Sequence, residues 1–491
     1  MRGKKRVAPK IFYSFSLDAV VPKDHLLRRL ASVIDFGFVS HRTRDLYYHA
    51  GPESVDPVVV VKVLLLDFLH NIGSVRETMR QCADRMSFRW FLGYDIDEPL
   101  PTHSAISKNV KRFGPELFQE LFDETVRLCG KHGLIGGRLV HVDSTPVKAN
   151  ASDDSVRLKT DDETFHPDLA PREYWDRVKK ETALAHPNVN DRMASATDPE
   201  AGIISRDGNG RMLAYKDHRA VDDKHGVILV TEATSAAVTD DTQFPVMVDD
   251  LIFHQGIFPD GIAADRIYGR VENYKHLFER GITPYIRRVR SPRQKGQYGK
   301  EQFRYDAGRD VYVCPEGQLL RQQGSLHQNQ YLYRASKPVC AVCPVRSACA
   351  TGKGPRTITR HHEEKYVEWA LADSHTLYFA DQLRRRMHVA EGSFAEAKNA
   401  HGHQRTRWRG RWKMQAQCYL VAAIQNLKKL LKWAWKDAET GGKRLTLSLS
   451  LRKNTEQYLN KLLLPPCSRE MSRFLDEITR KSIVKEPVWS Q

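Results

Sequence analysis

Residues 384–398 read RRRMHVAEGSFAEAK. The stretch contains one glycine and no proline, so it predicts a helix with a period of 3.6 residues. A carboxylate on a buried face of such a helix must be paired, protonated or bound to a cation. The five residues that share its most apolar face are Leu383, Met387, Glu391, Phe394 and Lys398. Two interpretations of Glu391 stay open at this point: a pair with a neighbouring arginine, or a metal ligand.

The stretch holds a second carboxylate, Glu396, which falls on a different face of the predicted helix. Arg385 and Gly392 share that face. A polar face of this kind is usually in contact with water. We therefore expect Glu396 to be solvated and to have no part in a buried site.

The composition indicates a basic protein of more than one domain. The chain has 491 residues and a formal net charge of +17. Such an excess of cationic groups favours a polyanionic partner, most often nucleic acid, although a basic enzyme without such a partner is the alternative. The longest apolar run, Val58–Leu66, contains Lys62 and is too short to span a bilayer. No apolar segment of signal-peptide type follows the basic residues 1–6, so we expect a cytoplasmic protein and no membrane partner.

The first 125 residues predict several short helices. Pro57–Leu69 is apolar on most sides and predicts a buried helix. Ser74 with Glu77 forms a capping box for the next helix. Thr102 can cap a third helix, residues 104–113, that carries exposed lysines and an arginine. Short helices of which the last is basic suit a DNA-binding unit of helix-turn-helix type, and a helical packing or dimerisation domain is the alternative.

A first strand carries an acidic residue near its end. Leu139–Thr145 alternates in the manner of a strand, and Asp143 lies close to its C-terminal end. In isolation, such an aspartate often caps a turn. After a polar excursion with a helical part near Glu173–Thr182, strand patterns return at Met212–Tyr215 and Val227–Thr231. The three strands together predict an antiparallel meander, which a helix at 244–254 would follow.

A second short strand also ends in an acidic residue. Gly261–Asp265 has the pattern of a buried strand, and residues 271–280 predict a helix with Gly281 just beyond its end. Strand ends that precede helices form the edge where α/β proteins bind ligands. Asp143 and Asp265 on adjacent strand ends, faced by Glu391, would make a site of three carboxylates. Such oxygens are the ligands that Mg²⁺ prefers, and two such metals promote phosphoryl transfer.

At these residues the sequence resembles the DDE transposases of bacterial insertion sequences, and most closely the insertion-sequence-1182 family. Four stretches carry the resemblance, which runs from about residue 15 to about residue 432. They are PLPTHSAI at 99–106, VDSTPVKAN at 142–150, DRIYGRVENY at 265–274 and EGSFAEAK at 391–398. The resemblance implies an RNase H-like catalytic core, Mg²⁺ or Mn²⁺ as cofactor, and DNA as partner, namely the terminal inverted repeats of the element and the target. It also implies a homodimer or higher homo-oligomer on DNA, in the nucleoid of a bacterium.

The resemblance assigns the catalytic triad to Asp143, Asp265 and Glu391. Related transposases place a lysine seven positions after the glutamate, and Lys398 fits that spacing. They place an arginine four positions before it, where this chain has Met387, with Arg386 adjacent. A Lys-Gly pair commonly follows the second aspartate, whereas this chain has Arg266-Ile267.

An insertion separates the second and third carboxylates, which are 126 positions apart. It contains Cys314, Cys340, Cys343 and Cys349, of which the middle two form a CxxC motif. Four thiolates with one such motif suit a tetrahedral structural zinc, and unligated cysteines in a loop are the alternative. We expect the zinc to fold a loop region that lacks an apolar core of its own.

A basic segment follows the predicted helix at 384–398. Its arginines alternate with tryptophans, which favours phosphate contacts with some base stacking, against the alternative of a solvated basic face. The residues concerned are Arg405, Arg407, Arg409 and Arg411, with Trp408 and Trp412. Residues 414–433 then predict a long amphipathic helix.

The sequence as a whole predicts an α/β protein with an RNase H-like mixed sheet, an all-α N-terminal domain and a cysteine-rich insertion. The expected divisions are 1–125, helical; 126–290, first part of the core; 291–375, insertion; 376–437, second part of the core; and 438–491, a C-terminal tail. The expected function is Mg²⁺-dependent DNA cleavage and strand transfer. The alternatives are a metal-dependent nuclease of the same fold and a domesticated DNA-binding regulator without catalysis.

Overall fold

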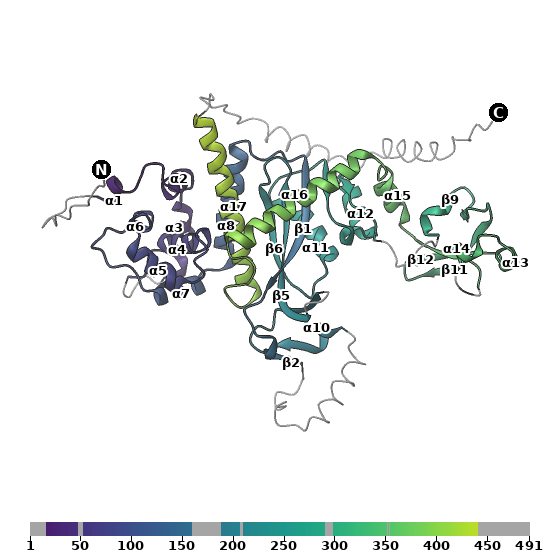
Figure 1. The fold of residues 1–491 in the computed structure, drawn as a ribbon, viewed down its shortest axis with the longest axis horizontal. Helices are drawn as coiled ribbons and strands as arrows, with labels where there is room; N and C mark the ends of the chain where they lie inside the picture. The colour runs from purple at the N-terminus through teal and green to yellow at the C-terminus, as the bar shows by residue number, and fades with distance from the viewer. Residues whose placement is uncertain are drawn as a thin grey trace, which may run out of the picture.

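The computed structural model describes residues 16–47, 53–159, 188–206, 210–289, 298–350, 352 and 354–439. The predicted helix near Glu173–Thr182, the turn at 207–209 and the segment from residue 440 lie outside these ranges. Figure 1 shows three parts in a row: a group of helices at one end, a mixed sheet in the centre, and a small second sheet at the other end. The structure is therefore a mixed α/β protein with a helical N-terminal region.

The N-terminal part consists of helices that surround α4. Nine residues of α4 are buried, among them Val60, Leu64 and Phe68. Complete burial of such a side chain stabilises the folded state by about 1.5–3 kcal/mol. The bounds of α4 agree with the predicted helix Pro57–Leu69. The helices are α1 (Leu17–Val20), α2 (Leu26–Val33), α3 (Gly37–Thr43), α4 (Pro57–Leu69), α5 (Val75–Asp84), α6 (Met86–Leu92), α7 (His103–Arg112) and α8 (Pro115–Lys131), with a 3-10 turn, η1, at Arg44–Leu46.

The predicted helix caps are present. The Ser74 hydroxyl accepts a hydrogen bond from the backbone N–H of Glu77 at the start of α5, and Thr102 caps α7 through the N–H of Ala105. Gly93 ends α6 with a positive φ of 86°, a conformation that glycine adopts without steric cost. These local signals fix where each short helix begins and ends.

The central sheet has six strands in the order β4-β5-β1-β7-β8, and β6 also pairs with β5, beyond the residues that pair with β4. The long β5 pairs antiparallel with both β1 and β6, which confirms the predicted meander. Strand β7 runs parallel to β1, and β8 runs parallel to β7. The bounds are β1 (Leu139–Lys148), β4 (Gly202–Arg206), β5 (Gly210–Asp222), β6 (Ile228–Ser235), β7 (Gly261–Ala263) and β8 (Thr283–Tyr285); the short β2 (Val156–Leu158), β3 (Met193–Ser195), η2 (Asp153–Ser155) and α10 (Val189–Arg192) lie beside the sheet.

The connections on one side of the sheet differ in detail from the sequence prediction. The helix expected at 244–254 begins earlier, as α11 (Asp240–Asp249), and its last turn is a π-helix, η4 (Asp250–His254). A 3-10 turn, η5 (Arg266–Tyr268), and α12 (Val271–Glu279) follow β7. The strand that follows, β8, has only three residues.

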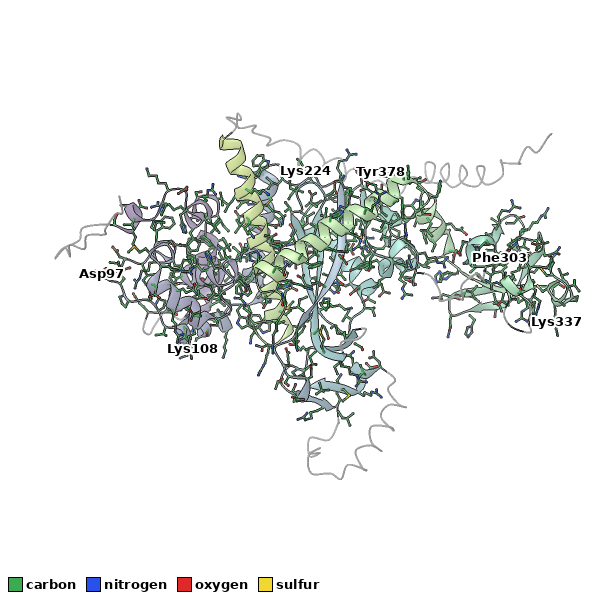
Figure 2. All side chains as sticks on the ribbon, in the orientation of Figure 1. Asp97, Lys108, Lys224, Phe303, Lys337 and Tyr378 are labelled. Carbon is green, nitrogen blue, oxygen red and sulfur yellow. The ribbon has the colours of Figure 1, made fainter. Side chains whose placement is uncertain are left out.

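The insertion is an antiparallel sheet of five strands rather than a loop region. Side chains of Phe303, Tyr312, Leu320 and Tyr333 form a small apolar core of its own, so the expectation that it lacks one was wrong. An ion cluster joins the insertion to the main body. In it, the buried carboxylate of Glu364 accepts hydrogen bonds from Arg288 and Lys300. The bounds are η6 (Lys300–Gln302), β9 (Arg304–Asp306), β10 (Val311–Val313), β11 (Leu319–His327), β12 (Gln330–Ala335), α13 (Lys337–Ala341), α14 (Arg346–Cys349) and β13 (Thr357–His361). Figure 2 labels Phe303 and Lys337 within it.

Three helices return the chain from the insertion to the sheet. They are α15 (Glu364–Leu371), α16 (Leu377–Ala400) and α17 (Arg411–Glu439). In Figure 1, α16 crosses in front of the central sheet, and α17 runs alongside α8. Helix α17 packs against α8, α4 and β6 at once, so it joins the N-terminal helices to the sheet. Within the described residues, no helix is both long enough and apolar enough to cross a membrane.

Candidate active site

Asp143 lies on β1 and faces α16. Its carboxylate is 15% exposed and lies 2.6 Å from Nη1 of Arg386 on α16. The other carboxylate oxygen, Oδ1, accepts a hydrogen bond of 2.9 Å from the backbone N–H of Ser144. The strand fixes the backbone of Asp143 and the arginine fixes its side chain, so the carboxylate has a defined direction.

Asp265 comes two residues after the end of β7, the strand that runs parallel to β1. Its Oδ1 accepts a hydrogen bond of 2.7 Å from the N–H of Ile267 and caps the turn η5. The side chain of Asn273 on α12 donates to the carbonyl of Tyr268 at the end of that turn and to the carbonyl of Asp241 at the start of α11. The loop that carries Asp265 is thus held by both neighbouring helices.

Glu391 lies on α16, but not on a buried face. Its side chain is 59% exposed, and Met387, one turn earlier, is 44% exposed. The predicted apolar stripe that contained both residues is therefore wrong. The residues of α16 that are buried are Phe379, Gln382, Ala390, Ser393, Phe394 and Ala397. Glu391 points to the open side of the site, and Nη2 of Arg386 lies 3.9 Å from its Oε1.

The three carboxylates share one electrostatic environment. The pKa of Asp143 is raised to about 6, because burial and, to a smaller extent, the charges of Asp265 and Glu391 outweigh the lowering effect of Arg386. Burial also raises the pKa of Asp265 above its ordinary value, although the nearby Arg386 guanidinium opposes this rise. Arg386 is therefore the common counter-ion of a cluster with more negative than positive charge. Hard divalent cations, which prefer oxygen ligands, fit this donor set.

Lys398 lies near the other end of α16. Its ammonium group donates a hydrogen bond of 2.5 Å to the hydroxyl of Thr145, two residues after Asp143 on β1. Lys398 follows Glu391 by seven residues, about two turns of α16. Its contact with Thr145 places that part of the helix beside β1.

The arginines that follow α16 have different environments. Arg405 and Arg409 are exposed, and Nε of Arg409 donates to the carbonyl of Asn150. The expected phosphate contact by Arg407 does not fit its position, because its guanidinium pairs with the buried Asp67 and lies 3.7 Å from the centre of the Phe68 ring. Arg407 instead fastens α4 to the loop before α17.

Glu396 is partly exposed, at 31%, and is paired, whereas the sequence predicted a solvated side chain. Its carboxylate accepts hydrogen bonds from Lys428 and Gln425 of α17 and lies 3.8 Å from His401. Although burial alone would raise the pKa of Glu396, the bonds from His401, Lys428 and Gln425 lower it. The prediction failed because the partners come from a helix about 30 positions later, which periodicity cannot reveal.

A buried polar network lies beneath α16, and the sequence analysis missed it. Asp217 and Arg219 on β5 are both 0% exposed and form an ion pair. The signal that could have identified it is the polar run Lys216–Arg219 inside β5, in which Asp217 and Arg219, two residues apart, share one face. His403 donates to the same carboxylate, and Cys418 lies beside it.

The ligand atoms of Asp217, His403 and Cys418 lie within 4.8 Å of one another, as those of a metal site would. Within the described ranges this is the one such group of three or more acidic, histidine or cysteine side chains. The group does not suit a cation, because the Arg219 guanidinium already contacts Asp217 at 2.8 Å and 2.9 Å. His403 is engaged through both ring nitrogens, to Asp217 and to Gln417. We interpret the network as a structural element of the core.

The four cysteines of the insertion are free and partly buried. Burial raises the pKa of the Cys349 thiol, and the other three cysteines raise it further. Among the described residues, no three of these sulfur atoms lie within 4.8 Å of one another. The backbone N–H of Gln318 donates to Sγ of Cys314 at 3.3 Å, in a turn that Gly317 permits with φ of 75°. An N–H group directed at sulfur stabilises a thiolate, as metal-binding cysteine turns require.

Two family profiles match the chain. One, described as Transposase domain (DUF772), matches residues 15–112, which include helices α1 to α7. The other, described as Transposase DDE domain, matches residues 313–431, which include Glu391 and Lys398. Two segments of the chain are therefore similar to transposase domains. A DDE domain implies the use of a divalent metal and of DNA.

Similarity beyond these profiles is slight. No protein of curated function matches the chain. Among solved structures, the chain is similar to a piggyBac transposase in a synaptic complex with hairpin DNA, with 9% identity, coverage of 94% of this chain and 84% of that one, and a TM-score of 0.34. The transposase domains therefore rest on the two profiles.

Proposed function

We propose that this chain is a DDE transposase that cleaves DNA at the ends of an insertion sequence and joins them to target DNA. One observation carries the proposal. Asp143, Asp265 and Glu391 come from three distant segments and gather around one counter-ion, Arg386, on one side of a mixed sheet. The transposase profiles at 15–112 and 313–431 support this function over other phosphoryl-transfer chemistry. A β1–β5 antiparallel pair flanked by parallel β7 suits an RNase H-like core.

The donor set fits Mg²⁺ or Mn²⁺, because all three side chains offer carboxylate oxygens and none offers sulfur or nitrogen. Metal ions in such sites activate the attacking oxygen and stabilise the leaving oxygen. Asp143 and Asp265 would hold the cation from the sheet, and Glu391 would close the site from α16. Arg386 and Lys398 flank the carboxylates and are placed to contact the phosphates of bound DNA.

The reaction would proceed in two displacements at phosphorus. Water first attacks the phosphodiester at the element end and releases a 3′-hydroxyl. That hydroxyl then attacks a phosphodiester of the target, and the target 3′-oxygen leaves. Both steps need DNA to lie along α16, where Arg405 and Arg409 add exposed positive charge. We propose that the N-terminal helices contribute further DNA contacts and that the protein acts as a homodimer or larger homo-oligomer.

We further propose that Cys314, Cys340, Cys343 and Cys349 hold one structural Zn²⁺. The presence of four free cysteines in one small sheet domain, the influence of the other three on the Cys349 thiol, and the N–H group directed at Cys314 support this. Thiolate prefers zinc and carboxylate prefers magnesium, so the two sites should not compete. Zinc would fix β10 to α13 and α14 at one edge of the small sheet.

The function is tested with Asp143→Asn, Asp265→Asn and Glu391→Gln in a strand-transfer assay that uses a labelled element end and Mg²⁺. Each change keeps the shape of the side chain and removes a charge that holds the cation, so each should abolish cleavage while DNA binding survives. Asp84→Asn and Glu279→Gln are matched controls, because both carboxylates are exposed and lie on other helices. Near wild-type cleavage by any triad variant would remove that residue from the site.

The same assay separates the alternatives. Cleavage without joining would indicate a metal-dependent nuclease of this fold. DNA binding with neither activity, at any Mg²⁺ or Mn²⁺ concentration, would indicate a regulator that has lost catalysis. Joined products that depend on all three carboxylates would support the transposase.

A further inference from the structure

Arg219 is the largest fully buried side chain among the described residues, and it lies directly beside the carboxylate site. It pairs in register with Asp143 across the antiparallel β1–β5 ladder. Residues opposite each other in such a ladder project from the same face of the sheet. Arg219 therefore points toward α16, as Asp143 does, but it is wholly enclosed.

The guanidinium of Arg219 reaches the helix that carries Glu391. Its Nη1 lies 3.3 Å from both the carbonyl oxygen and the hydroxyl of Ser393, which follows Glu391 by two residues on α16. The same Nη1 donates to Oε1 of Gln425 on α17 at 2.8 Å. The planar group also lies 4.8 Å from the centre of the Phe394 ring.

The opposite side of the guanidinium is fixed by Asp217. Nε donates to one oxygen of this carboxylate at 2.9 Å, and Nη2 lies 2.8 Å from the same oxygen in an ion pair. Thr231 donates to the other oxygen at 2.8 Å, and His403 donates to the first at 2.9 Å. The Arg219 side chain thus has no freedom to follow a shift of α16 along the sheet.

Stability alone is a poor explanation for such a group. A buried ion pair loses the hydration of both charges, and replacing it by apolar residues is often neutral or stabilising. Two other directional contacts join α16 to β1, from Arg386 to Asp143 and from Lys398 to Thr145, and both are made by side chains. The hydrogen bond from Arg219 to the Ser393 carbonyl differs from them, because it holds the backbone of the helix itself.

We propose that Arg219 is a positioning residue that sets the separation of Asp143 and Glu391. It connects the strand position opposite Asp143 to the helix backbone next to Glu391, so that carboxylates 248 positions apart in the sequence can share one divalent cation. Gln425, which also donates to the Ser393 carbonyl at 2.8 Å, assists from α17. The inference rests on the proposed function, because it assumes that these carboxylates bind a metal.

The test measures Mn²⁺ affinity by calorimetry in the full-length protein. Arg219→Lys keeps the positive charge but removes the planar guanidinium group, whose separate nitrogens contact Asp217, Ser393 and Gln425. The double variant Asp217→Asn/Arg219→Gln removes both charges, so no unpaired ion remains in the core. Gln425→Met removes the helper contact without burying a charge, which keeps the test valid if the other variants do not fold.

We expect the double variant to weaken Mn²⁺ binding by about 10–100-fold, as loss of outer contacts to a metal site commonly does. Gln425→Met should weaken it by a few-fold, and high Mg²⁺ should restore part of the cleavage in each case. The matched control is Asp67→Asn/Arg407→Gln, a second buried pair that makes no contact with α16 among the described residues. It should lower the melting temperature and leave Mn²⁺ affinity unchanged.

Two results would overturn the inference, and they differ in meaning. Wild-type Mn²⁺ affinity in the folded Arg219 variants and in Gln425→Met would refute the positioning role and leave the proposed function intact. Absence of any Mn²⁺ binding that depends on Asp143, Asp265 and Glu391 in the otherwise native protein would refute both.

Discussion

Asp143→Asn should stabilise the protein in the absence of metal, although it should abolish cleavage. Burial and the neighbouring carboxylates raise the pKa of Asp143 from 3.8 to about 6. Because the pKa is higher in the folded state, the folded protein keeps the proton on Asp143 between pH 3.8 and about 6, where the unfolded chain has already lost it. The stability that this carboxyl contributes is thus complete below pH 3.8 and is lost as the pH rises through 6.

The magnitude follows from the size of the shift. A rise from 3.8 to about 6 corresponds to about 3 kcal/mol at 1.36 kcal/mol per pKa unit, and the side chain is only 15% exposed, so screening by solvent is modest. Asparagine resembles the protonated form and keeps an oxygen for Arg386. At pH 8 the free energy of unfolding of Asp143→Asn should therefore exceed that of the wild type by up to about 3 kcal/mol, and at pH 5 by about half as much.

Urea unfolding in EDTA, followed by tryptophan fluorescence at pH 5, 6.5 and 8, measures this difference. Asp84→Asn, an exposed carboxylate on α5, is the control and should change little at any pH. Added Mg²⁺ should stabilise the wild type by about 1.4 kcal/mol at ten times its Kd and should not stabilise Asp143→Asn. A variant that is less stable than the wild type at pH 8, or whose advantage does not change with pH, would refute the electrostatic reasoning.

Three further predictions concern other parts of the chain. Glu396→Gln should destabilise the protein by about 2 kcal/mol, measured by urea unfolding at pH 7, because Lys428 and His401 lose their charged partner; an unchanged midpoint would contradict the contacts of Glu396. DNA affinity should fall about 10- to 1,000-fold between about 50 and 200 mM salt, measured by fluorescence anisotropy, and a flat response would mean that the net charge of +17 serves another purpose. Protein purified without chelator should contain about one zinc per chain by elemental analysis, and Cys340→Ser/Cys343→Ser should make residues 314–349 sensitive to protease; zinc-free protein with four free thiols would refute the zinc site.

Local signals in the sequence were sufficient for most of the elements that carry the site. The strand around Asp143, the short strand before Asp265 and the helix around Glu391 all appear where alternation and helical periodicity predicted them. The three residues could be identified as candidates for this reason. Their cluster around one arginine is a tertiary fact, which the pattern of single elements only suggested.

The failures have a common physical cause. The exposed face of α16 was mistaken for the buried one because small residues, Ala390 and Ala397, and the polar Ser393 make its contact with the sheet, whereas the larger Met387 is exposed. Burial of a helix depends on what it meets, not on the hydrophobicity of its own residues alone. The partners of Glu396 and Arg219 are likewise separated from them by tens to hundreds of positions, a distance at which sequence periodicity carries no information.

The position of α17 has a consequence for how the protein forms during translation. This last described helix packs on α8, α4 and β6, elements that leave the ribosome some 190 to 370 positions earlier. Until α17 emerges, the apolar surfaces that it covers on those elements stay exposed, and exposed surface of this kind makes a nascent chain prone to aggregation and dependent on chaperones. We therefore expect truncated translation products to be degraded rather than to bind DNA as incomplete competitors.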